Sequence, residues 1–207
     1  CLGLLTAFDL AARTVATGLH PVAIVSVEIQ SPFLEAVDPR PWLVLADAAA
    51  CVILGRPDSG AGVLASHLAN DGSLRGSVAM VHPGLSAEPA RIRFTDTNRR
   101  MTTEAVDFLV NSARRVVEAA GTSLDAIDWF VPHQPNGTML ARTVDVLEIG
   151  DRYVPIVHET GAIGSASLGV SLDRLRRSGR VRPGQRVLFV GVGAGVGYGA
   201  LLYQEAP

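Results

Sequence analysis

The chain lacks lysine altogether, so all 18 of its basic residues are arginines. They are nearly matched by 20 acidic residues, and the formal net charge is −2. A nucleic-acid or polyanion partner is usually met by a strongly basic surface, so this balance indicates no nucleic-acid partner. Any charged contact made through a cationic side chain must use arginine.

Cysteine is also scarce, because Cys1 and Cys51 are the only two, and two are too few for a disulfide scaffold. No apolar run reaches membrane-spanning length, and no basic segment followed by an apolar stretch opens the sequence. No spacing of histidine, cysteine and acidic residues is typical of a metal site. We therefore expect a cytoplasmic protein with no membrane contact, no metal and no bound cofactor.

Apolar residues, in contrast, make up 48% of the chain, which predicts a large buried core. Helical periodicity alternates with short β-branched runs, and this alternation predicts an α/β layered fold. Helices are expected over residues 2–17, from a cap at Thr102 or Thr103 to Gly121, and over 138–148 and 166–178. Strands are expected over 22–29, 47–54, 62–71, 128–133, 153–158, 186–193 and 197–204.

Residues 76–90 hold several glycines and prolines with little periodicity, and we predict that they link two units, 1–75 and 91–207. The sequence has no initiator methionine and begins at once in an amphipathic pattern. We therefore expect an upstream portion that is not part of this sequence.

Cys1 leads directly into the first predicted helix. The amide groups at a helix N-terminus carry partial positive charge and favour the thiolate, which is the form that attacks thioesters. The alternative is a small, inert, buried cysteine, which is the interpretation we give to Cys51.

His133 ends a predicted strand in the segment "VPHQPN" (131–136), where a sheet presents side chains to a cleft. Pro132 and Pro135 restrict the backbone on either side, which suits a fixed catalytic imidazole. The alternative is a structural histidine within the core.

The glycine run 191–199, "GVGAGVGYG", is not a dinucleotide-binding loop, because Val196 stands where the third glycine of that motif would fall. Too little chain follows it for the next helix and strand. A tight loop whose amides approach a ligand is one interpretation, and a plain β-hairpin of small residues is the other.

Together these segments resemble β-ketoacyl-acyl carrier protein synthase III over all 207 residues. The resemblance is carried by a cysteine that opens a helix, "DAAACVIL" (47–54), "ASHLANDGS" (65–73), "VPHQPN", the stretch "TGAIGSAS" (160–167) and the segment 178–202. It implies a thiolase-like αβαβα fold of two similar halves, of which the N-terminal half is incomplete here.

The resemblance also implies roles for residues. Cys1 is the nucleophile that takes an acyl group from acyl-CoA or from the phosphopantetheine arm of an acyl carrier protein, and His133 assists it. The amides of Cys1 and Ala194 form the oxyanion hole. A homodimer and a small-molecule acyl acceptor are the further partners that it implies.

Two departures from the family pattern matter for function. The family has "GNTSAAS" where this chain has residues 161–167, so Ala162 replaces an asparagine that donates a hydrogen bond. His158 and Glu159 are candidate substitutes for that asparagine. Thr138 replaces a phosphate-contacting arginine, and we expect Asn136 and Thr138 at the substrate-binding surface.

Loss of one donor to an oxyanion typically costs about 2.7–4 kcal/mol of transition-state stabilisation. Decarboxylative condensation relies on that donor more than simple acyl transfer does. The favoured hypothesis is therefore acyl transfer through Cys1 to a hydroxyl, amine or carrier thiol in specialised metabolism. The alternatives are decarboxylative Claisen condensation in fatty acid or polyketide synthesis, an inactive partner subunit, and an N-terminal nucleophile hydrolase.

Overall fold

The computed structural model describes residues 1–56, 60–80, 84–85, 87 and 89–207. Its helices and strands, in chain order, are α1 (Gly3–Ala16), β1 (Val22–Glu28), α2 (Pro39–Val44), β2 (Ala48–Leu54), β3 (Gly62–Asn70), β4 (Val78–Met80), β5 (Ile92–Phe94), α3 (Asn98–Ala119), β6 (Trp129–Pro132), α4 (Gly137–Val146), α5 (Val157–Thr160), α6 (Ala166–Arg177), β7 (Arg186–Gly193) and β8 (Gly197–Gln204). The predicted α/β class is confirmed.

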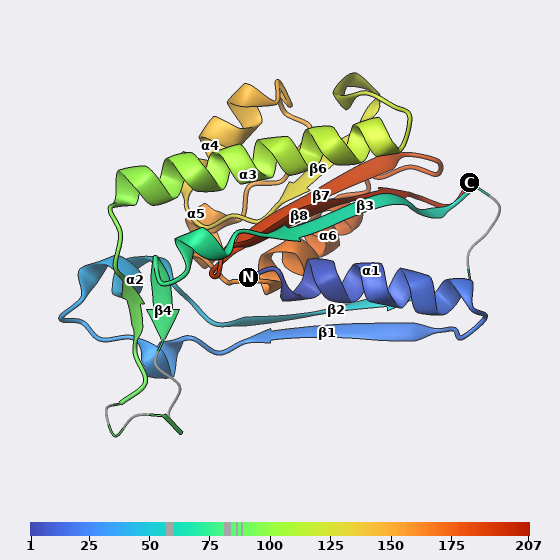
Figure 1. Cartoon of the computed structure of the whole chain (residues 1–207). Coiled ribbons are helices and arrows are strands. Elements are labelled where there is room, and N and C mark those ends of the chain that lie inside the picture. The colour runs from blue at the N-terminus through green and yellow to red at the C-terminus, as the bar shows by residue number, and fades with distance from the viewer. Residues whose placement is uncertain (57–59, 81–83, 86, 88) are drawn as a thin grey trace.

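The elements form layers around a four-stranded sheet (Figure 1). Its strand order is β3-β8-β7-β6, with β6 parallel to β7 and the other neighbours antiparallel. Helices α3 and α4 lie over one face, and α1 and α6 lie over the other. The β1–β2 hairpin packs against the far side of α1 and α6.

Alternating side chains of β7 divide the core in two. Leu188 and Val190 pack toward α3, whereas Val187 and Phe189 pack toward α1 and α6. A strand with both faces buried reads as a continuous apolar run, which is why residues 186–193 were recognisable in the sequence. The described part of the chain therefore supplies the layers α, β, α and β, four of the five that we expected.

Strand β3 belongs to the same sheet as β8, with which it pairs from Gly62 to Asn70. The predicted unit 1–75 thus contributes a strand to the sheet of unit 91–207, and the division stays a prediction. At the ends of the predicted linker, β4 pairs antiparallel with β5. Residues 81–83, 86 and 88 of that linker lie outside the described residues.

The strand predicted over 153–158 is wrong. Only an isolated bridge joins Tyr153 to Phe130, and residues 157–160 form the short helix α5. The backbone N–H groups of Ile156 and Val157 donate to the Gln134 side chain rather than to a neighbouring strand. Pro155 has no N–H to offer, so this segment cannot build a regular ladder.

The cap predicted at Thr102 or Thr103 is also wrong. Helix α3 begins at Asn98, and the hydroxyl of Thr97 accepts a hydrogen bond from the Arg100 N–H at 3.3 Å. Any of these threonines could cap a helix, and in the structure Thr97 does so.

Of the helices described, α3 included, none has both the length and the apolar character to cross a bilayer.

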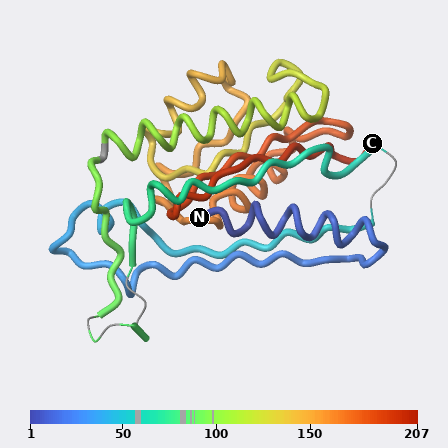
Figure 2. Tube along the Cα trace, viewed as in Figure 1, coloured from blue at the N-terminus to red at the C-terminus, as the bar shows by residue number. Residues whose placement is uncertain are grey.

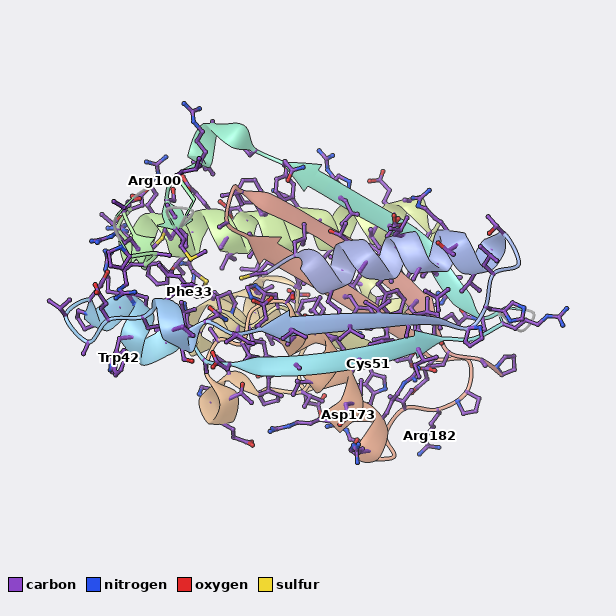
Figure 3. The ribbon with its side chains drawn as sticks, turned by 90° about the horizontal axis from the view of Figure 1, so that it is seen from below. Phe33, Trp42, Cys51, Arg100, Asp173 and Arg182 are labelled. Carbon is purple, nitrogen blue, oxygen red and sulfur yellow. The ribbon has the colours of Figure 1, made fainter. Side chains whose placement is uncertain are left out.

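The outer face of the β1–β2 hairpin is apolar and exposed. Val25, Val27 and Ile53 expose 66%, 58% and 68% of their surface. Cys51 shares this face and is exposed, so the expectation that it is buried is wrong (Figure 3). The two strands alternate, with Ile24 and Ser26 facing inward, and nothing in the described residues covers their outward side chains.

Candidate active site

Cys1 stands just before the first turn of α1. The helix begins at Gly3, and the N–H of Thr6 donates to the Leu2 carbonyl at 3.0 Å. Leu5 and Phe8 are buried against the main sheet and hold the helix in place. Cys1 itself is exposed. Its thiol therefore lies at the positive end of a helix and is open to a substrate, as the thiolate chemistry requires.

The turn between β7 and β8 lies directly against Cys1. A methyl group placed on Gly193 would lie 3.3 Å from the Cys1 main-chain nitrogen and 3.5 Å from its Cβ. Figure 2 shows the N-terminus beside this turn. The glycine run is thus a β-hairpin, as one interpretation held, and its backbone approaches Cys1. That its amides approach a ligand stays a prediction.

The same turn is held in place from its other side. Val196 and Asp71 exchange backbone hydrogen bonds of 2.9 and 2.8 Å, which tie the turn to the end of β3. Ala194 follows Gly193 directly and is exposed. Its amide is therefore carried on a fixed turn next to Cys1, where an oxyanion donor would have to stand.

His133 follows β6, and its N–H donates to the Val190 carbonyl at 2.8 Å. The residue is only 4% exposed, and its Nδ1 atom is buried with no hydrogen-bond partner in the described structure. Burial is the main cause of the pKa of His133, which is lowered from 6.5 to about 3. The ring is therefore a neutral imidazole, and its strand pairs with β7, whose end approaches Cys1.

Gln134, the next residue, has a structural role that the sequence did not reveal. Its Nε2 donates to the Val154 carbonyl and the Ser171 hydroxyl, at 2.8 and 3.2 Å. Its Oε1 accepts from the N–H groups of Ile156 and Val157, at 2.9 and 3.1 Å. This buried amide joins the strand that ends at His133 to the segment before α5. In the sequence, the position of Gln134 next to His133 was the signal available for this role.

Comparison with known proteins identifies the family of this chain. Residues 1–72 match the family model for 3-oxoacyl-[acyl-carrier-protein] synthase III, and residues 117–204 match the model for the C-terminal part of the same synthase. The chain belongs to the 3-oxoacyl-acyl carrier protein synthase III family. Its fold is accordingly thiolase-like, as predicted.

Several members of the synthase III family resemble the whole chain. The β-ketoacyl-acyl carrier protein synthases III of Blochmanniella floridana and Methylococcus capsulatus are each 28% identical over 98% of it. The Aquifex aeolicus synthase III structure gives a TM-score of 0.90 at 24% identity over 99% of this chain and 64% of its own. The structure of the priming β-ketosynthase of the R1128 polyketide pathway gives a TM-score of 0.88 at 28% identity, over 100% of this chain and 64% of its own. The chain spans 64% of the length of these curated relatives.

Ala162, where the resemblance predicts that an asparagine is missing, is buried. Its N–H donates to the Val44 carbonyl at 2.7 Å, and its carbonyl accepts from the Ala46 N–H at 3.1 Å. A parallel bridge between Leu45 and Ala162 thus fixes the loop to the segment between α2 and β2. The backbone of this position is anchored, but its side chain has nothing to donate.

The two candidate substitutes for the asparagine are both exposed. Glu159 pairs with Arg174 of α6, with their charged atoms 2.9 Å apart. The His158 ring packs on Gly137, where an added methyl group would lie 2.9 Å from its Cε1. His158 therefore lies at the start of α4, and Glu159 is engaged on the surface of α6.

The predicted substrate-binding residues lie at that same start of α4. The side chain of Asn136 caps the helix by accepting a hydrogen bond of 2.9 Å from the Met139 N–H. Thr138 is exposed. The structure thus brings Asn136, Thr138 and His158 together at one helix end, and their contact with a substrate stays a prediction.

Glu28 was not singled out from the sequence, although it is the one charged residue in the apolar run 22–29. Its Oε1 accepts from the Ser165 N–H at 2.8 Å and from the Ser165 hydroxyl at 2.5 Å. A methyl group on Gly164 would lie 2.5 Å from the carboxyl carbon of Glu28, so the glycine makes room for this carboxylate.

Among the described residues, no group of three or more histidine, cysteine and acidic side chains is placed to hold a metal.

Proposed function

We propose that this protein is an acyltransferase that exchanges acyl groups through a thioester on Cys1. The observation that carries the proposal is the contact of the Gly193 turn with Cys1. The buried His133, whose Nδ1 has no partner in the described structure, is hydrogen-bonded to β7, the strand that leads into this turn. A nucleophile, a neutral base and a fixed turn of backbone amides are the groups that acyl transfer needs.

In the first half-reaction, the Cys1 thiol passes its proton to His133 and attacks the thioester carbonyl of an acyl-CoA or acyl carrier protein. The amides of Cys1 and Ala194 stabilise the oxyanion that forms. The old carbon–sulfur bond then breaks, and the leaving thiolate takes the proton back from His133. In the second half-reaction, His133 removes the proton of a hydroxyl, amine or carrier thiol that attacks the S-acyl-cysteine. The bond from the acyl carbon to the Cys1 sulfur breaks, and the Cys1 thiolate takes that proton from His133.

Ala162 supports transfer over condensation. Condensation by decarboxylation of a malonyl unit develops an enolate oxygen, and Ala162 has no side-chain donor to stabilise it. Its backbone N–H is already bonded to Val44. Transfer onto Cys1 and off again develops no enolate, so the alanine costs it little.

Mass spectrometry of the protein after incubation with a panel of acyl-CoAs tests this proposal. We expect one acyl adduct on the peptide that contains Cys1, and none in a Cys1→Ala variant. A Cys51→Ser variant serves as the matched control and should be labelled like the wild type, because Cys51 lies on the outer face of β2. Absence of any adduct on Cys1 would count against the proposal and favour an inactive partner subunit.

Condensation is the second candidate, favoured by the names of the relatives, which include a synthase III and a priming ketosynthase. The two candidates separate when acyl-CoA is supplied together with malonyl-acyl carrier protein. Release of carbon dioxide with a β-keto product would establish condensation, whereas acylation of Cys1 without release supports transfer. An N-terminal nucleophile hydrolase is disfavoured because Cys1 leads into a helix rather than a strand.

A further inference from the structure

The segment before α6 departs from the family pattern at four positions, 162–165, and two of them, Gly164 and Ser165, contact Glu28. Aligned with "GNTSAAS", Gly164 and Ser165 stand where the family has serine and alanine. Gly164 has a positive φ of 53° and leaves the space that the Glu28 carboxyl group fills. Ser165 supplies both hydrogen bonds that hold the carboxylate. The two departures therefore act together to place one acidic side chain.

The carboxylate is fixed through one oxygen only. Oε1 accepts from the Ser165 N–H and hydroxyl at the start of α6, where the helix dipole favours a negative charge. The Ser165 hydroxyl also lies 2.6 Å from that of Ser26, which is buried on β1. Oε2 takes part in no hydrogen bond within the described residues, and Glu28 is half-buried. One oxygen is thus anchored and the other is free to accept.

The anchored group lies at the nucleophile end of α1. A methyl group on Gly3, two residues after Cys1, would be 3.6 Å from the Ser165 hydroxyl oxygen. Through Ser165, Glu28 therefore lies beside the first turn of α1, which follows Cys1, and not on a remote surface.

We propose that Glu28 binds the acyl acceptor, with Oε2 accepting a hydrogen bond from an acceptor hydroxyl or amine. This inference rests on the proposed acyl transfer and selects among its three acceptor classes. A carboxylate attracts O–H and N–H donors but repels the thiolate form of a carrier thiol. The acceptor oxygen or nitrogen bonds to the acyl carbon, the bond to the Cys1 sulfur breaks, and the acceptor proton passes through His133 to the Cys1 thiolate.

The Glu28→Gln variant tests the free oxygen without removing the anchor. Its carbonyl oxygen can still accept from Ser165, whereas an NH₂ donor replaces the free acceptor. The protein is purified together with any polypeptide that co-purifies with it. Cys1 is then acylated with an acyl-CoA that has been shown to label it. Glycerol, glycinamide or pantetheine is then added, and the loss of the acyl mass is timed. Glu118→Gln, an exposed change on α3 across the main sheet, is the matched control.

We expect Glu28→Gln to load at the wild-type rate but to discharge to glycerol and glycinamide about tenfold or more slowly, as loss of a charge-assisted hydrogen bond requires. Discharge to pantetheine should not slow. Ser165→Ala should show the same selectivity to a smaller degree. The assignment of Glu28 would be overturned if the variant slowed equally with all three acceptors or with none. It would also be overturned if the wild type discharged to pantetheine alone or to none of the three. Failure to load Cys1 at all would instead overturn the acyl transfer on which it rests.

Discussion

At the scale of single residues, His133 combines burial with an unpartnered nitrogen. A histidine buried in its neutral form lowers the free energy of unfolding when the solution becomes acidic, because the unfolded chain can bind a proton that the folded chain excludes. The pKa of about 3 in the folded state lies well below the ordinary value of 6.5. Stability associated with this ring is therefore complete above pH 6.5 and is lost as the pH falls toward 3.

This linkage predicts a difference between the wild type and a His133→Asn variant, which has no titrating group at this position. The free energy of unfolding of the wild type should fall by about 1.4 kcal/mol per pH unit more than that of the variant below pH 6.5. Between pH 7 and pH 5 the extra loss should reach about 2 kcal/mol. Urea unfolding at several pH values measures it, and parallel curves for the two proteins would contradict the prediction.

Gly193 gives a second prediction at this scale. A Gly193→Ala methyl group would press on the main-chain nitrogens of Cys1 and Leu2, at 3.3 and 3.2 Å. We expect the rate of Cys1 acylation to fall about tenfold or more, because a shifted oxyanion donor loses its geometry. The readout is the time course of the Cys1 adduct by mass spectrometry.

Gly72→Ala is the control for this change, because an added methyl group there meets nothing within 4 Å. It should acylate like the wild type. If Gly193→Ala also acylates normally while its melting temperature is unchanged, the turn is not part of the oxyanion site.

At the scale of elements, the Gln134 side chain replaces a strand. It satisfies two backbone donors and one backbone acceptor of residues 154–157, which therefore need no neighbouring ladder. The β-branched run "YVPIVH" is typical of a strand, yet a single side chain from another segment diverts it. Such a long-range side-chain contact leaves no local pattern.

Removal of this amide should be costly. Gln134→Ala leaves the N–H groups of Ile156 and Val157 without their acceptor in a buried site, so the free energy of unfolding should fall by about 2–4 kcal/mol. Chemical denaturation measures this loss. Thr138→Ala, at an exposed position, should change stability by less than about 0.5 kcal/mol. A Gln134→Ala protein as stable as this control would show that the bonds matter little.

At the scale of the whole molecule, the outer face of the β1–β2 hairpin gathers several exposed apolar side chains. Transfer of the exposed side chains Val25, Val27 and Ile53 out of water would be favourable by about 1.5–3 kcal/mol for each one fully buried. Strand β1 also pairs on one side only, with β2. An apolar face joined to an open strand edge favours association.

We therefore predict that the 207-residue chain, purified alone, self-associates. The double variant Val25→Glu and Ile53→Lys should shift it toward the monomer without a large loss of stability, because both side chains are already exposed. Sedimentation velocity at several concentrations distinguishes the two states. Val146→Glu, at an exposed apolar position on α4, is the control and should leave association unchanged. A monomeric wild type would refute the prediction.

Much of this molecule could be predicted from local patterns. Apolar periodicity alone located α1, β1, β2, β3, α4, α6, β7 and β8 to within a few residues, because each element buries a regular set of its own side chains. The resemblance to the synthase III family then brought Cys1, His133 and the glycine turn into one candidate site, and the structure shows the contact of Cys1 with that turn.

Other features were decided only by tertiary structure. The path of residues 153–158 depends on Gln134, the place of β3 depends on its pairing with β8, and the anchoring of Glu28 depends on Ser165. In each case the deciding hydrogen bonds join residues far apart in the chain. The amino-acid sequence by itself determined which segments become helices and strands, since those depend on near neighbours. Which distant polar groups meet was determined by packing, since only the folded core brings them within bonding distance.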